Sequence, residues 1–214
     1  KISSTADPSQ EISLTEEAMA NAKSQQVDIF APQNFKNSEK YLAKAKEARA
    51  DQNKNEDILQ YVAESRAWLT QAKQKAQVGK AATAELEMAR IQALQAGAST
   101  THPKEFKNLE KQTRSFTEKM EDGNLTKVDK RSAELTEEYH ALEIKAVKSN
   151  LLSMAQDNIE TAKDEGAKRS APKSLLLAEE KLKRAVIAIE ANPHNTPDLR
   201  TLADEATRET EHLL

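Results

Sequence analysis

Apolar residues recur along this chain every three or four positions, which is the spacing of amphipathic helices and not of strands. Three times, a proline is followed by a mostly apolar stripe at three, six, ten, thirteen and seventeen residues beyond it. This 3-4-3-4 spacing is the a/d pattern of helical bundles and coiled coils, so each proline is predicted to open a helix of about 18 residues. The stripes consist of Phe35, Ser38, Leu42, Ala45 and Arg49, then Phe106, Leu109, Thr113, Phe116 and Met120, then Leu175, Ala178, Leu182, Ala185 and Ile189.

The three stripes belong to a longer repeat of 69–71 residues. In each copy an alanine stands ten residues before the proline, a phenylalanine or leucine three residues after it, and a glutamate seven residues after it. A chain that copies one unit at a fixed period is an array of supersecondary units. The motif consists of Ala22, Pro32, Phe35 and Glu39, then Ala93, Pro103, Phe106 and Glu110, then Ala162, Pro172, Leu175 and Glu179.

Helices are also expected on either side of each proline helix. One is predicted over 11–29, and long segments over 56–96 and 125–165 contain no proline and at most one glycine. At 1.5 Å per residue, each long segment would form one continuous helix of roughly 60 Å that closes one bundle and opens the next. The prediction is an all-α fold of three tandem three-helix bundles, similar to spectrin repeats and joined by these continuous helices.

Stacked end to end, three such bundles would form an elongated rod on the order of 90 Å. A compact solenoid with the long helices folded back is the alternative arrangement. The predicted division is a flexible lead-in over 1–10 and helical repeats over 11–78, 79–147 and 148–214.

Composition narrows the function classes. Apolar residues make up 37% of the chain and aromatic residues 4%, so each core is expected to be slim and to leave no room for a pocket of several hundred cubic ångströms. The net charge is −3 with the two signs interleaved, which argues against nucleic-acid binding. No cysteine and no recognisable catalytic motif occur. The chain is therefore predicted not to be an enzyme and to hold no cofactor.

The repeated glutamates Glu39, Glu110 and Glu179 occupy an e position beside the a/d seam. Such residues commonly form interhelical ion pairs that set register. The alternative is a ligand contact copied three times. The favoured interpretation is the structural one, because glutamates at e positions are routine in helical bundles.

Two Glu-x-x-His motifs, Glu137–His140 and Glu209–His212, have the spacing used in di-iron bundles. They lie in different repeats and beside the apolar stripes, so no metal site is predicted, and a metal-binding bundle remains only as an alternative function. Tyr61 and Trp68, seven residues apart, share a helix face. The favoured interpretation is that both side chains pack at the edge of the core. The alternative is that they are exposed and bind a protein partner.

The motif and its alanine-, lysine- and glutamate-rich setting resemble a domain of unknown function in Gram-negative envelope lipoproteins. Ala22, Pro32, Phe35, Glu39 and Leu42 give the closest match, and the third copy matches almost as well. The second copy departs from the pattern, with His102 before its proline and Thr113 in place of the leucine. In that family a signal peptide and a lipidated cysteine precede the helical region, and an OmpA-like peptidoglycan-binding domain often follows it.

The resemblance implies a non-catalytic spacer or protein-interaction region in the periplasm, associated with the outer membrane. Membrane contact would come only from an N-terminal lipid anchor outside this chain, and peptidoglycan contact only from a C-terminal domain outside it. The alternative is a cytosolic or secreted spectrin-like scaffold. In either case the protein partner is not identified by the sequence.

Overall fold

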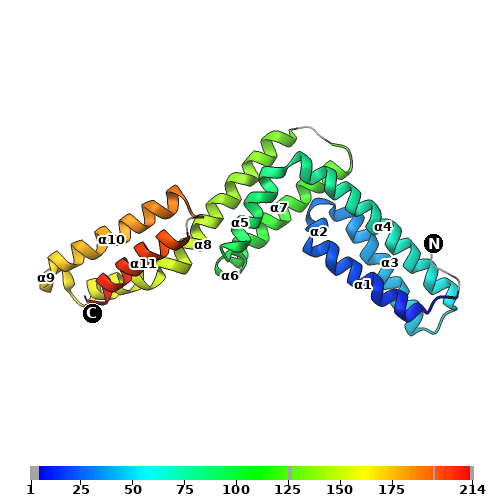
Figure 1. The fold of residues 1–214 in the computed structure, drawn as a ribbon, viewed down its shortest axis with the longest axis horizontal. Helices are drawn as coiled ribbons and strands as arrows, with labels where there is room; N and C mark the ends of the chain where they lie inside the picture. Colours follow the sequence, from blue (N-terminus) through cyan, green and yellow to red (C-terminus); the bar gives the residue numbers. More distant parts are fainter. Residues whose placement is uncertain (1–4, 125–126, 195, 213–214) are drawn as a thin grey trace. The chain divides into compact units, whose positions relative to one another are not determined.

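The structure, a computed structural model, describes residues 5–124, 127–194 and 196–212. Over these ranges the secondary structure is helical and includes no strand, so the all-α prediction is confirmed (Figure 1). The helices of these ranges are α1 (Pro8–Ser24), α2 (Val27–Phe30), α3 (Pro32–Ala50), α4 (Asn55–Ala82), α5 (Ala84–Gln95), α6 (Ala98–Thr101), α7 (Pro103–Glu121), α8 (Val128–Asp164), α9 (Ala167–Ser170), α10 (Pro172–Ala191) and α11 (Thr196–Glu211).

Each motif proline opens a helix, as predicted. Pro32, Pro103 and Pro172 are the first residues of α3, α7 and α10. Proline suits this position because its missing N–H would have no helical partner there. A fourth proline, Pro8, starts α1 behind the N-cap Asp7, whose carboxylate accepts from the Ser9 backbone N–H at 2.9 Å. The predicted lead-in over 1–10 was therefore too long.

The segment before each motif proline contains a four-residue helix that the sequence did not predict. A residue with left-handed backbone starts it in every copy: Gln26 at φ 62°, Gly97 at φ 81° and Gly166 at φ 93°. The helix predicted over 11–29 therefore ends at Ser24, and α2 follows it. Glycine directly after a helix commonly marks the end of that helix. The first copy lacks this signal, because Gln26 stands where the other two copies have glycine.

One of the two predicted continuous helices is interrupted. The segment 56–96 splits into α4 and α5 at Thr83, whose backbone lies at φ −135° and ψ 42° and whose hydroxyl donates to the Gly79 carbonyl at 2.9 Å. The residue types do not predict this break, because a single threonine does not by itself end a helix. The second predicted segment, 125–165, contains one uninterrupted helix, α8, over Val128–Asp164 (37 residues), and its predicted first residue Leu125 lies outside the described ranges.

The chain divides into two compact units. Unit 1 comprises Lys1–Glu87 with Asn108–Leu135, and unit 2 comprises Met88–Lys107 with Thr136–Leu214. The divisions fall within α5, α7 and α8, so they do not coincide with the three predicted repeats, whose boundaries stay a prediction.

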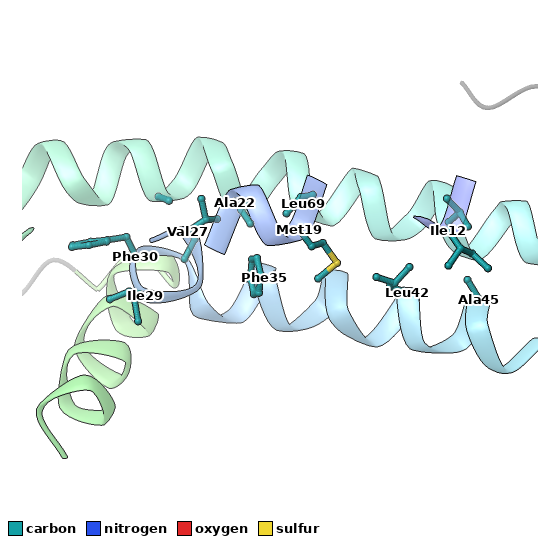
Figure 2. Packing of buried hydrophobic residues seen from close by; sticks show 14 of the residues in the cluster. Ile12, Met19, Ala22, Val27, Ile29, Phe30, Phe35, Leu42, Ala45 and Leu69 are labelled. Atoms are coloured by element: carbon teal, nitrogen blue, oxygen red, sulfur yellow. The ribbon is translucent and has the colours of Figure 1, made fainter. Parts of the chain in front are cut away.

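In unit 1, α1, α3 and α4 pack around one core (Figure 2). The predicted stripe of α3 faces it with Phe35, Leu42 and Ala45 buried, although Ala48 takes the place of Arg49. Ser38 and Ser65, both 0% exposed, meet inside it: each hydroxyl donates to the other residue's carbonyl, at 2.8 and 2.9 Å. Such a reciprocal bond satisfies both buried hydroxyls and fixes the register of α3 against α4.

In unit 2, the later part of α8 packs with α9, α10 and α11. The predicted stripe of α10 lines this core with Leu175, Ala178, Ala185 and Ile189 buried and Leu182 half-buried. Leu152 of α8 and Leu199 of α11 complete the packing around Ile189. The Asn158 amide of α8 also donates to the Thr210 hydroxyl of α11 at 3.1 Å.

Candidate functional site

The repeated alanines are packing residues. Ala22, Ala93 and Ala162 are at most 1% exposed, and each lies on the helix that runs toward its motif proline. A buried side chain of this size lets neighbouring backbones approach closely. Phe35 and Leu175 are buried at the next motif position, whereas Phe106 is half-buried and packs edge-on against Tyr139, with ring centroids 6.3 Å apart.

The repeated glutamates form the interhelical contact that their position predicts in two copies of three. Glu39 lies 3.8 Å from Lys23 of α1, and Glu179 lies 2.6 Å from Lys163 of α8. The second copy differs because Leu94 replaces the lysine, and there Glu110 is only 6% exposed, with Arg114 of its own helix 3.9 Å away. These partly exposed pairs orient helices more than they stabilise them, because water screens them.

Within unit 1, the turn that contains α2 is bonded to α7 of the following repeat. The Thr117 hydroxyl, 1% exposed, donates to the Ile29 carbonyl at 2.5 Å. The Arg114 guanidinium donates to the Asp28 carboxylate at 3.0 Å. We call these contacts of residues 25–34 with α7 the first joint.

The first joint also supplies the cap that α3 lacks in its own sequence. Ala31, the N-cap residue of α3, offers no side-chain acceptor. The Glu121 carboxylate of α7 accepts instead from the backbone N–H of Gln33 at 2.7 Å and of Asn34 at 3.3 Å, and from the Asn34 amide at 2.9 Å. A negative charge here meets otherwise unbonded amides and the positive end of the helix dipole.

The pKa of Glu121 nevertheless lies above its usual value. Burial is the largest cause and raises the pKa, while the hydrogen bonds from the Gln33 and Asn34 backbone and from the Asn34 amide lower it. The neighbouring carboxylate of Asp122 adds a further, smaller increase.

The only glycine between 56 and 96 lies beside the first joint, where α4 meets α2. A Cβ at Gly79 would lie 3.2 Å from the Phe30 carbonyl oxygen, so the residue permits α4 to approach α2. Beside it, an open groove of about 670 Å³ is lined by Phe30, Val78 and Met120 among others. The expectation that no space of several hundred cubic ångströms would exist is therefore wrong; the groove is formed where a turn meets two helices and not within a slim core.

In unit 2, the turn that contains α6 meets α8. The Asn150 amide donates to the Ala96 carbonyl at 2.8 Å, and Asn150 stands 71 residues after Gly79. The loop after α10 also meets α8, where His194 Nδ1 lies 2.8 Å from Glu143 Oε1. We call these contacts of residues 95–103 and 190–194 with α8 the second joint.

Glu143 is the most deeply buried carboxylate of the described residues, at 2% exposed. His140 Nδ1 lies 3.5 Å from its Oε2, which has no hydrogen-bond partner. A polar pocket of about 290 Å³, lined by Glu143, His194, Asn150 and Arg200 among others, opens beside it.

The two Glu-x-x-His motifs are not brought together as metal ligands. Glu137 is exposed, whereas Glu209 lies 3.3 Å from Lys181. Among the residues that the structure describes, no group of three or more histidine or carboxylate side chains has an arrangement that could hold a metal ion.

The aromatic pair lies at the edge of the unit 1 core. Tyr61 is half-buried and packs against that core, with Lys44 Nζ 5.7 Å from its ring centroid. Trp68 is also half-buried. Their role as a partner site stays a hypothesis.

Comparison with protein-family models, curated proteins and solved structures finds no match to this chain. None of the helices in the described ranges combines the length and the apolar character that a membrane span requires.

Proposed function

We propose that the chain is a non-catalytic helical spacer and protein-interaction region, built as three tandem three-helix bundles. The observation that carries this proposal is the first joint. There, Thr117 and Glu121 of α7 are bonded to Ile29 and to the start of α3. A spacer needs its neighbouring repeats bonded in a set orientation, and such direct contacts resist bending better than a flexible linker does.

Small-angle X-ray scattering of the chain tests this proposal. A rod of about 90 Å, made of three stacked helix lengths, has a radius of gyration near 26 Å. An ordinary compact domain of this length has a radius of gyration of about 17 Å. A value near the second figure would refute the spacer function, and Thr117→Val should lower a rod-like value by loosening the first joint.

We further propose that the spacer belongs to a bacterial envelope lipoprotein and lies in the periplasm at the outer membrane. Support comes from the motif around Pro32 and Pro172, which resembles the helical region of such proteins. A lipid anchor before this chain and a peptidoglycan-binding domain after it would then be the two ends that the spacer separates.

Fractionation and intact-mass measurement of the full-length native protein test the envelope assignment. We expect a membrane-bound species that carries a diacylglyceryl group on an N-terminal cysteine. A soluble, unmodified species would reject the envelope assignment and favour the spectrin-like scaffold, whose partner a pull-down would then identify.

A further inference from the structure

The outward face of α10 carries large apolar side chains that its own unit does not cover. Leu176 is 58% exposed, Leu177 43% and Ile187 54%. They make up three of the seven large hydrophobic side chains that are exposed in the described parts of the chain. Single exposed apolar residues are ordinary, but a group of them on one helix face indicates a binding surface.

The other two proline helices show that the fold does not need apolar residues there. Aligned on the motif prolines, α3 and α7 have lysine, asparagine and glutamate at the three positions that Leu176, Leu177 and Ile187 occupy in α10. The counterparts are Lys36, Asn37 and Glu47 in α3, and Lys107, Asn108 and Glu118 in α7. The apolar face is therefore a property of the third copy alone.

Four positions on this face have the spacing of a coiled-coil seam. Leu177, Glu180, Arg184 and Ile187 follow one another at three, four and three residues, the order a, d, a, d. Glu180 and Arg184 are exposed, and neither forms an ion pair in the ranges that the structure describes.

This seam is complementary to itself when two copies run antiparallel. Residues whose numbers are symmetric about position 182 then lie opposite one another: Leu177 faces Ile187 of the second copy, and Glu180 faces Arg184. Antiparallel coiled coils pair a with d positions in this way. A twofold-symmetric interface presents the same patch from both partners, so every favourable contact occurs twice.

We propose that the outward face of α10 is a self-association surface, on which a second copy of this chain docks antiparallel through Leu177, Glu180, Arg184 and Ile187. The surface is separate from the spacer function and does not depend on the envelope assignment. A seam of four layers buries less than about 1,000 Å², so the dimer is weak, with a Kd on the order of 100 μM.

One neighbour of the seam opposes association. Lys183, which is exposed, lies beside the symmetry axis, where it approaches Lys183 of the second copy. Like charges placed opposite one another are unfavourable at an interface. Lys183→Ala should therefore tighten the dimer by about threefold.

Sedimentation equilibrium of the full chain tests the surface. The concentrations run from about 5 μM to about 1 mM, so that they bracket the expected Kd. We expect the weight-average mass to rise from the monomer value of 23.8 kDa toward twice that value. Glu180→Arg or Arg184→Glu alone places like charges opposite one another and should weaken association about tenfold or more. The double reversal restores the pairing and should recover association to within about threefold of the original.

One further variant, with two substitutions, uses residues that α3 and α7 carry at the aligned positions. Leu177→Asn combined with Ile187→Glu gives α10 the residues of α3 and α7, and should leave a folded monomer with unchanged circular dichroism. A wild-type chain that stays monomeric at 1 mM, or a double reversal that fails to restore association, overturns the proposal.

Because the chain has no cysteine, disulfide trapping reports the orientation of the two copies. Leu177→Cys and Ile187→Cys chains should cross-link with each other when mixed, and neither should cross-link with itself. Cross-linking of each variant with itself would indicate parallel helices and would also overturn the proposal.

Discussion

The two joints share a backbone design and differ in their chemistry. A left-handed residue and a four-residue helix precede α3 and α7 alike, and each of these helices begins with a proline. In the first joint, side chains of α7 bond directly to this turn, through Thr117, Arg114 and Glu121. In the second joint, the bonds from the turn and from the loop after α10 both run to α8, through Asn150 and Glu143.

Aligned positions show how the difference arises. Val186 of α10 occupies the position of Thr117 and packs into the unit 2 core. Glu190 occupies the position of Glu121 but lies 2.5 Å from Lys148 of α8. The repeated backbone therefore does not repeat its contacts with neighbouring helices, because one or two side chains at the helix end decide where that end is bonded.

Thr117→Val is expected to have the largest effect, since it gives α7 the residue that α10 has at the aligned position, Val186. The variant keeps the side-chain shape but leaves the buried Ile29 carbonyl without its donor, at a cost of about 1–3 kcal/mol in the free energy of unfolding. Urea denaturation followed by circular dichroism measures it.

Thr70→Val is the matched control, because the Thr70 hydroxyl is exposed and bonds only to Arg66 of its own helix. It should change the free energy of unfolding by less than about 0.5 kcal/mol. Equal effects of the two substitutions would mean that the bond across the first joint contributes nothing specific.

His194→Ala tests the second joint. It removes the contact on Glu143 Oε1 and leaves a buried carboxylate whose second oxygen already lacks a hydrogen-bond partner. Because His194 is itself largely exposed, the expected loss is about 1 kcal/mol, below the cost of breaking a fully buried pair.

His140→Ala is the control at the same carboxylate. Its Nδ1 lies 3.5 Å from Glu143 Oε2, beyond good hydrogen-bond distance, so the expected loss is less than about 0.5 kcal/mol. A larger loss for His140→Ala than for His194→Ala would show that the loop after α10 is not what this carboxylate holds.

The sequence predicted what depends on periodicity and missed what depends on contact between distant segments. The stripes after Pro32 and Pro172 and the ion pairs of Glu39 and Glu179 follow from local spacing, and the structure contains them. The break at Thr83 has no local signal, because it occurs at a residue type that helices tolerate.

The joint residues were missed for the same reason. Thr117 and Glu121 bond to residues 87 or 88 positions earlier, and His194 bonds to Glu143 across a loop. Gly79, beside the first joint, carried a visible signal, because it is the one glycine between 56 and 96. Glycine at such a position indicates a close approach of backbone, which is what it permits here.

The smallest expected effect is a pH dependence whose sign differs between Glu121 of the first joint and Glu105 of unit 2. Burial raises the pKa of Glu121 in the first joint, so this group contributes stability below its unfolded pKa, and that contribution is lost as pH rises through the folded value. Relative to Glu121→Gln, the wild type should therefore gain stability as pH falls from about 7 toward 4.5. Urea midpoints of the two proteins across this range measure the difference.

Glu105 of unit 2 is the control with the opposite sign. The hydrogen bond from Lys145, 2.5 Å away, lowers the pKa of this carboxyl, so its contribution is present above the unfolded pKa and is lost as pH falls through the folded value. Relative to Glu105→Gln, the wild type should lose stability on acidification below about pH 4.5. If both comparisons had the same slope, burial would not govern Glu121, and its bonds to the first turn of α3 would stabilise the charged carboxylate as Lys145 does at Glu105.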